Sequence, residues 1–245
     1  MKTSIALLLV SLASCQSMGP GSMPPISQLS GSLGTVRLAE TSTDITSALT
    51  AESDLAVPFA LAVAPPIEAS WRGNVYGTWS SEERAKLRAW ADEWIRNGTL
   101  SRLEILPSTT FGTDVPENAA EMRSVVRSEA AAAQADAVLV FARATGADPS
   151  SNVLAILDLT LIGGFIFPGH SVEVRTITEV VLLDTRNGFQ YATGYGEASD
   201  ERSSTGFGIA KNVRRLGDRL QAEALERSVD DLLVRAGVRA WSGTR

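Results

Sequence analysis

The sequence predicts an α/β (α+β) fold: a mixed sheet of five or six strands in the order β-α-β-α-β-β-β-β-α, built in two or three layers. Up to about residue 146, strand-length apolar runs alternate with two helical patterns, which is typical of crossovers onto a parallel sheet. From residue 153 to 198, strand-like runs follow one another without a helical pattern, which indicates antiparallel hairpins. An amphipathic pattern near residue 220 predicts a final covering helix.

The first strand and helix have clear boundaries. The apolar run LAVPFALAVAPP, residues 55–66, is closed by two prolines and has the length of a buried strand. Ser80 and Glu83 form the pattern of a capping box, so we expect a helix over Ser80–Asn97, and Gly98 suits the left-handed position after it. Its apolar face predicts core packing rather than a ligand platform; that face comprises Leu87, Trp90, Ala91, Trp94 and Ile95.

Two further strands flank a second helix. SRLEILPSTTF, residues 101–111, is a short strand that ends near Pro107. The spacing predicts a helix over Glu117–Gln134, and ADAVLVFARATG, residues 135–146, is the third strand. These elements complete the half of the sheet that we expect to be parallel.

The second half predicts antiparallel pairing. We expect a strand over residues 153–167, and Val172–Leu183 should pair with Phe189–Ala198 through the turn DTRNG, Asp184–Gly188. The last helix should cover Ile209–Ala236, with a kink at Gly217.

The N-terminus predicts export. A basic start is followed by the apolar run Ile5–Leu12, which is too short to span a bilayer. The sequence Leu12-Ala13-Ser14-Cys15 resembles the bacterial lipobox, in which the peptide is cut before a Cys whose thiol carries a diacylglycerol. The alternative is a plain signal peptide with an incidental Cys.

The lipobox resemblance implies a division of the chain into three parts. Residues 1–14 are the signal peptide, Cys15 and the Ser/Gly/Pro-rich stretch to residue 54 are a lipidated tether, and 55–245 are a single domain. Gln16 stands where enteric-type lipoproteins kept in the inner membrane have Asp. The implied location is the bacterial cell envelope, with the lipid on Cys15 in the outer membrane and the domain facing the periplasm.

Composition and motifs give little support for catalysis. Hydrophobic residues make up 44% and charged residues 20%, and the net charge of −6 argues against nucleic-acid binding. His170, expected in a loop, is the only histidine, so a His-based metal cluster or a Ser-His-Asp triad lacks partners. We therefore expect no cofactor, no metal and no enzyme activity.

Three weaker site patterns have structural alternatives. GYG at 194–196 and GFG at 206–208 look like glycine loops, but neither continues into a nucleotide-binding motif, and an anion at the second competes with a plain helix entry. Asp158 and Asp184 could act as acid and base. The alternative is that Asp184 caps its turn and Asp158 meets a hydrogen-bond partner.

The segment LIGGFIFPG, residues 161–169, is apolar and uncharged around two glycines. It is either a hairpin buried in the core or a loop that contacts a partner. If it is exposed, the contact residues are Leu161, Ile162, Phe165, Ile166 and Phe167.

Two resemblances rest on longer motifs. ADAVLVFARAT and TEVVLLDTRNGFQYATGYGEAS resemble the α/β domains of the curli-secretion lipoprotein, the penicillin-binding-protein activator lipoproteins and the N-terminal domain of TolB. The order of LAVPFALAVAPP, LEILPSTTF, ADAVLVFARATGADPSSN, DLTLIGGFIFPG and VVLLDTRNGFQYATGYG resembles the rhombotarget lipoproteins. That family implies a lipobox and a similar domain without an established activity. Its rhomboid-processed apolar tail has no counterpart in VRAWSGTR, which leaves Cys15 as the expected anchor.

Three functions remain open. The first is a non-enzymatic envelope lipoprotein that binds a protein partner or self-associates. The second is a subunit of an oligomeric outer-membrane secretion or assembly structure. The third is a hydrolase, which the missing catalytic partners disfavour.

Overall fold

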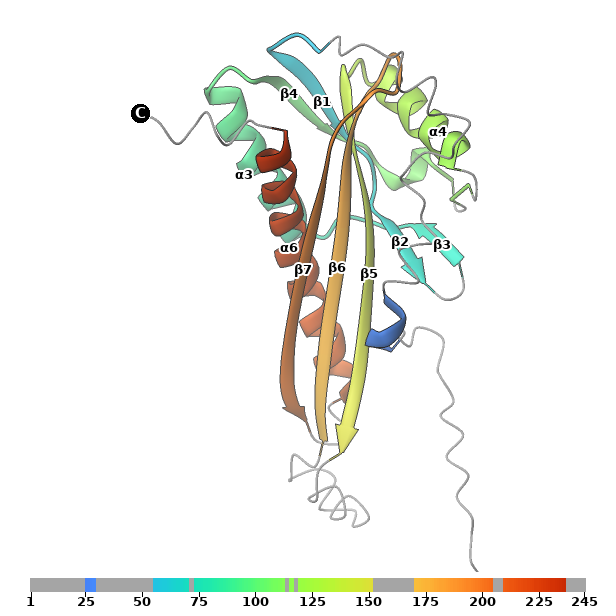
Figure 1. The fold of residues 1–245 in the computed structure, drawn as a ribbon, viewed down its shortest axis with the longest axis vertical. Coiled ribbons are helices and arrows are strands. Elements are labelled where there is room, and N and C mark those ends of the chain that lie inside the picture. Colours follow the sequence, from blue (N-terminus) through green and yellow to red (C-terminus); the bar gives the residue numbers. More distant parts are fainter. Residues whose placement is uncertain are drawn as a thin grey trace, which may run out of the picture.

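The computed structural model describes residues 25–29, 55–70, 73–112, 115–116, 119–151, 170–204 and 209–236. These residues form one seven-stranded mixed sheet with helices on both faces (Figure 1). The strands are β1 (Phe59–Val63), β2 (Ile67–Ser70), β3 (Gly73–Tyr76), β4 (Leu100–Ile105), β5 (Ala137–Ser151), β6 (His170–Asp184) and β7 (Gln190–Ser204). The helices are α3 (Ser81–Arg96), α4 (Ala119–Ala132) and α6 (Ile209–Arg235), with short 3₁₀ turns η1 (Ile26–Gln28) and η2 (Ser108–Thr110).

The sheet has a parallel part and an antiparallel part, as the sequence predicts. β1 runs parallel to both β4 and β5. β5, β6 and β7 form a long antiparallel set, in which Ala137 pairs with Asp184 and His170 with Ser204. The predicted pairing of Val172–Leu183 with Phe189–Ala198 is therefore confirmed, and the predicted strand over 153–167 lies outside the described residues.

The number of layers changes along the molecule. Beside β1 and β4, α4 packs on one face of the sheet while α3 and the C-terminal half of α6 pack on the other (Figure 1). Further along β5–β7, α6 continues alone on its face, where Leu216, Leu220 and Ala224 cover Val172 and Val174. Both the two-layer and the three-layer prediction thus hold, each for a different part of the sheet.

Three local features differ from the sequence prediction. The hairpin β2–β3 was not predicted, because each strand has only four residues and β3 begins with a glycine and an asparagine. His170 is the first residue of β6 and pairs with Ser151, because the antiparallel register extends that far. GYG lies within β7 and is not a loop. The helix α6 runs without a break through Gly217, and the expected kink there stays a prediction.

Candidate functional site

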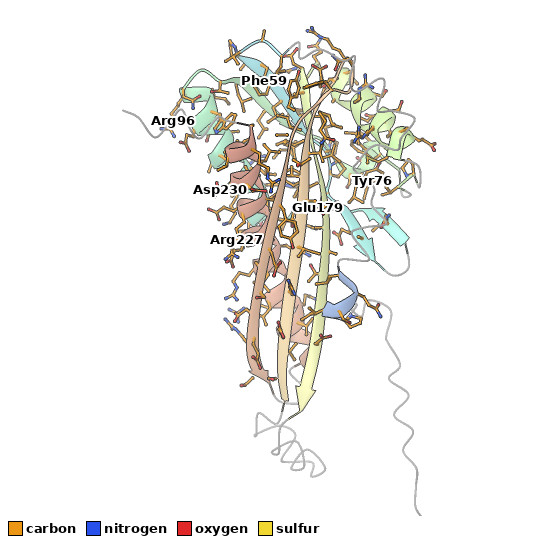
Figure 2. All side chains as sticks on the ribbon, viewed as in Figure 1. Phe59, Tyr76, Arg96, Glu179, Arg227 and Asp230 are labelled. Atoms are coloured by element: carbon orange, nitrogen blue, oxygen red, sulfur yellow. The ribbon has the colours of Figure 1, made fainter. Side chains whose placement is uncertain are left out.

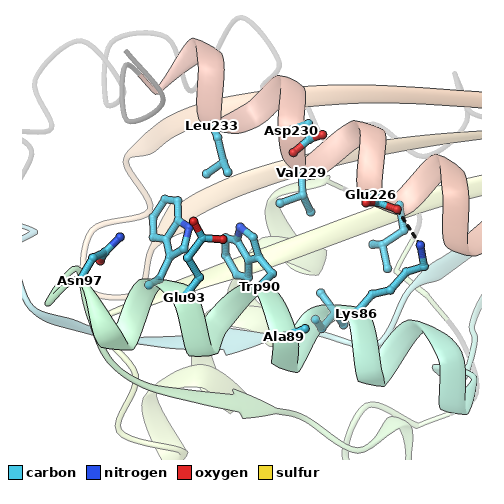
Figure 3. A pocket seen from close by; sticks show the side chains of 12 residues that line it. Lys86, Ala89, Trp90, Glu93, Asn97, Glu226, Val229, Asp230 and Leu233 are labelled. Carbon is cyan, nitrogen blue, oxygen red and sulfur yellow. Dashed lines mark hydrogen bonds and ion pairs between the residues drawn. The ribbon is translucent and has the colours of Figure 1, made fainter. Parts of the chain in front are cut away.

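An open groove of about 390 Å³ separates α3 from the C-terminal half of α6 (Figure 3). Both helices lie on the same face of the sheet and share one apolar cluster with it. Figure 3 shows side chains of both helices pointing toward each other across the groove. The lining residues are Lys86, Leu87, Ala89, Trp90, Glu93, Trp94, Asn97, Leu225, Glu226, Val229, Asp230 and Leu233.

Local sequence fixes the position of α3. Ser80 Oγ accepts a hydrogen bond from Glu83 N, and Glu83 Oε2 accepts one from Ser80 N, so the predicted capping box is present. Asn97 is the C-cap, and Gly98 follows with φ +79°, which suits a residue without a side chain. Leu87 and Ala91, one turn apart, bury this helix against the sheet.

Two tryptophans form one wall of the groove. The ring centroids of Trp90 and Trp94 lie 5.0 Å apart with planes tilted by 40°. Trp94 is 9% exposed, whereas Trp90 is only partly buried and Ile95 is 40% exposed. The prediction that the whole apolar face is core is therefore right for Trp94, incomplete for Trp90 and wrong for Ile95, because α6 covers only part of that face.

Trp90 also holds an unused hydrogen-bond donor. Its indole Nε1 is shielded from solvent and has no hydrogen-bond partner. Indole N–H groups that leave water normally find an acceptor, and a missing one costs about 1–3 kcal/mol. The groove wall thus has one polar group that an incoming acceptor would satisfy after a small side-chain movement.

The groove rim is acidic. Lys86 Nζ lies 2.6 Å from Glu226 Oε2, an exposed ion pair that joins the two helices. Glu93 from α3 adds a further carboxylate, and the lining includes no other cation. Asp230 on α6 (Figure 2) also lines the groove but has a partner of its own. An apolar floor with a net negative rim is suited to an apolar group that carries a neighbouring positive charge.

A second polar cluster lies on the face of β6 and β7 opposite α6. Arg175 Nη2 lies 2.6 Å from Glu197 Oε1, and this contact holds the pKa of Glu197 below its usual range. Burial raises the pKa of Glu179. Burial, followed by the hydrogen bond to Glu197, raises the pKa of Tyr195 to about 12. Arg175, Glu197 and Tyr195 bind one another, and the cluster contains no nucleophile–base pair.

Asp184 has the structural role that the sequence offered as an alternative. Its Oδ1 accepts hydrogen bonds from Arg186 N at 2.7 Å and Asn187 N at 3.2 Å, and Tyr191 Oη donates to its Oδ2 at 2.6 Å. Asp184 is 2% exposed, so it caps the turn from β6 to β7. Its possible acid–base partner, Asp158, lies outside the described residues, as do residues 206–208.

The expected lipidation site and the candidate contact segment lie outside the described residues. Cys15 and the candidate contact residues lie outside the described ranges; the latter are Leu161, Ile162, Phe165, Ile166 and Phe167. Among the residues that the structure does describe, no group of three or more His, Cys, Asp or Glu side chains could hold a metal ion. No helix in those ranges is long and apolar enough to cross a membrane.

No protein-family model matches the chain, and no curated protein sequence matches it. Several solved structures are similar to it, all with TM-scores below 0.5. Lipoprotein GNA1162 from Neisseria meningitidis is 17% identical over 64% of this chain and 97% of its own, with a TM-score of 0.30. The C-terminal domain of LpoB from Salmonella enterica is 13% identical over 63% and 91%, with a TM-score of 0.29. XCC0632 from Xanthomonas campestris is 13% identical over 76% and 89%, with a TM-score of 0.37.

Some of these neighbours are bacterial lipoproteins. The description of the groove rests on the residues of this chain and not on those neighbours.

Proposed function

We propose that this protein is a non-enzymatic lipoprotein of the bacterial envelope whose α/β domain binds a protein partner. The observation that carries the proposal is the groove between α3 and α6, with Trp90 and Trp94 in its wall. Partly exposed tryptophans in a hollow are typical of the few residues that dominate a protein interface. Binding, and not catalysis, is what an apolar groove without an acid–base pair supports.

The proposed occupant is a segment of the partner that places an aliphatic or aromatic side chain beside a Lys or Arg. The apolar side chain would pack between Trp90 and Val229, and the positive charge would lie near Glu93. A carbonyl of the segment would accept from Trp90 Nε1, which has no acceptor in the free domain. Charge complementarity of this kind contributes mainly to association rate and specificity.

The proposed attachment is a lipid on Cys15, in the outer membrane and facing the periplasm. Leu29 is 2% exposed in the core of the domain, and Ile26 N donates to Asp148 Oδ1 at 3.1 Å. The proposed free tether is therefore the ten residues 15–24, and a flexible chain of that length would reach on the order of 15–20 Å. A Cys15→Ser protein should lose labelling by a palmitate analogue and should no longer pellet with membranes. Unchanged labelling of that variant would end the lipidation proposal without affecting the groove.

A contact through residues 161–169 remains a second proposal. Phe165→Glu with Phe167→Glu should unfold the domain if the segment is buried, because unpaired buried carboxylates are strongly unfavourable. If the segment is a contact surface, the pair should keep its thermal stability and lose partner recovery. A stable variant that retains recovery would refute this contact.

Assembly through the edge of the sheet is less favoured than partner binding. β7 is an edge strand, and an open edge can pair with another chain. Asp231 Oδ2 accepts from Tyr195 N at 2.9 Å, and Arg227 Nη1 donates to Glu197 O. These two side chains of α6 occupy backbone groups in the middle of the β7 edge, so an oligomeric secretion structure is a weaker alternative. A hydrolase is also a weaker alternative, because the groove has no acid–base pair.

Photo-crosslinking of the full lipoprotein in cells tests the groove. A photoreactive residue at Ala89, which lines the groove, should yield one discrete adduct. The same residue at Glu121, exposed on α4 across the sheet, is the control and should not yield it. Trp90→Ser and Glu93→Lys should each abolish the adduct, whereas Trp90→Phe should keep it.

Other occupants give other results. An adduct with the mass of two copies of this chain would assign the groove to self-association. Equal adducts from Ala89 and Glu121, or an adduct insensitive to both Trp90→Ser and Glu93→Lys, would remove the groove from the binding surface.

A further inference from the structure

A smaller hollow of about 140 Å³ lies where two parallel strands end. Val63 and Ile105, the last residues of β1 and β4, are neighbours in the register, and Leu106 N donates to Val63 O at 2.9 Å. The residues that line it are Pro65, Gly77, Thr78, Trp79, Arg84, Arg88, Ile105, Leu106, Pro107 and Ser108. In open α/β sheets, ligands bind beyond the carboxyl ends of the strands, which is where this pocket lies.

The N-terminus of α3 is held at the same edge. Trp79 is 5% exposed, and its Nε1 donates to Ala64 O at 3.2 Å, which ties the start of the helix to the end of β1. Ser80 then begins the capping box. The positive end of a 16-residue helix therefore faces the pocket region, although this alone would not define a site.

Two arginine side chains add positive charge to the pocket. Arg84 and Arg88 lie one helical turn apart on α3, and both line the pocket. Neither guanidinium makes a hydrogen bond or an ion pair with any residue that the structure describes. Most other described arginines are engaged: Arg102 binds Ala133 O and Gln134 O, and Arg219 binds Asp200.

The nearby carboxylates do not neutralise this pair. Glu68 Oε1 lies 2.8 Å from Arg143 Nη2, and Glu83 Oε1 binds Arg143 Nη1. A Cβ at Gly77 would lie 2.8 Å from Glu68 Cδ, so residue 77 must lack a side chain for Glu68 to reach Arg143. Arg143 therefore binds both carboxylates, and no carboxylate among the described residues pairs with Arg84 or Arg88.

We propose that this pocket binds a phosphoryl group, held by the exposed side chains of Arg84 and Arg88 with the hydroxyls of Thr78 and Ser108 as additional donors. Planar guanidinium groups bind phosphate through paired N–H donors, and the two prolines and the buried strand ends give the pocket rigid walls. The phosphoryl group belongs either to a phospholipid headgroup or to a soluble phosphate. The site does not depend on the groove, which is lined by other residues of α3.

The test uses the mature lipoprotein in neutral detergent micelles. Inorganic phosphate at constant ionic strength should raise the thermal midpoint by linkage and give a saturable calorimetric titration. Arg84→Gln with Arg88→Gln should weaken phosphate binding at least tenfold. Arg214→Gln with Arg215→Gln removes two adjacent, exposed arginines of α6 and should leave binding unchanged.

A second arm separates the two sources. Micelles doped with phosphatidylglycerol, compared with phosphatidylcholine, should produce the Arg84- and Arg88-dependent stabilisation if the ligand is a lipid headgroup. Stabilisation by phosphate without an effect of phosphatidylglycerol assigns a soluble phosphate. The proposal is overturned if neither probe acts, or if the Arg214/Arg215 variant loses binding as much as the Arg84/Arg88 variant.

Discussion

Gly194 of β7 lies directly against the backbone of α6 at Ser228. A Cβ at Gly194 would lie 2.6 Å from Leu232 N and closer still to Ser228 O. Two residues further along the strand, a Cβ at Gly196 would lie 2.5 Å from Ser228 N and closer still to Ala224 O. The two glycines of GYG therefore allow α6 to approach the sheet, and they set the position of the α6 wall of the groove.

The first prediction concerns this approach. Gly194→Ala should lower the free energy of unfolding by about 1–3 kcal/mol or more, because the helix backbone must move to accept the methyl group. Urea unfolding followed by circular dichroism measures the change. Thr193→Ala, on the neighbouring residue of the same strand, is the control and should have a small effect. Equal stability of Gly194→Ala and the wild type would show that α6 packs less closely than described.

The second prediction concerns Arg143, a buried cation on β5. It is 5% exposed, binds both Glu83 and Glu68, and lies with its Cζ 5.9 Å from the Trp79 ring centroid. Arg143→Met should cost about 3–5 kcal/mol, because it leaves Glu83, 1% exposed, without its charge partner.

A double variant isolates the charge effect. Arg143→Met with Glu83→Gln removes both charges and keeps an amide that can accept the capping bond, so it should be more stable than Arg143→Met alone. Arg84→Met, on an exposed arginine of α3, should change little. If the single and double variants are equally unstable, the cause is the lost packing of the Arg143 side chain and not the unpaired charge of Glu83.

Elements with local signals could be predicted from sequence. Ser80, Glu83 and Gly98 fix both ends of α3 through bonds within the helix or next to it. Asp184 and Gly188 fix the turn between β6 and β7 in the same way, since Asp184 binds the turn amides and Gly188 has φ +75°.

Elements that depend on distant residues could not. The hairpin β2–β3 is held beside β5, where Glu68 reaches Arg143, 75 residues away. The groove depends on the position of α6. Gly194 and Gly196 of β7 set that position, because they lie against the helix backbone. One signal was present in the sequence: Lys86 and Glu93 are interleaved with Leu87, Trp90 and Trp94, which indicates that this face meets solvent at its edge.

The third prediction concerns the two tryptophans of the groove. Trp94→Ala should cost about 3 kcal/mol, the lower end for a buried aromatic residue, because one side of its ring borders the open groove. Trp90→Ala should cost less, since its ring is only partly buried. Urea unfolding of both variants measures the order, and a larger loss for Trp90→Ala would mean that the groove is closed in solution.

The last prediction concerns two glutamates on the face of the sheet opposite α6. Burial raises the pKa of Glu179, so its native state binds a proton more readily than its unfolded state. Its contribution to stability therefore falls as pH rises past about 4.5, the ordinary pKa of a glutamate carboxyl. Glu179→Gln should therefore stabilise the domain at neutral pH, and the gain should shrink as acid protonates the wild-type residue.

The pKa of Glu197 shifts in the opposite direction, because its hydrogen bond with Arg175 lowers it. Glu197→Gln should destabilise the domain at neutral pH, and this loss should vanish as pH falls through the native pKa of Glu197. Urea unfolding of both variants at neutral pH and near pH 4 tests the signs, and shifts in the same direction at neutral pH would contradict the proposed environments.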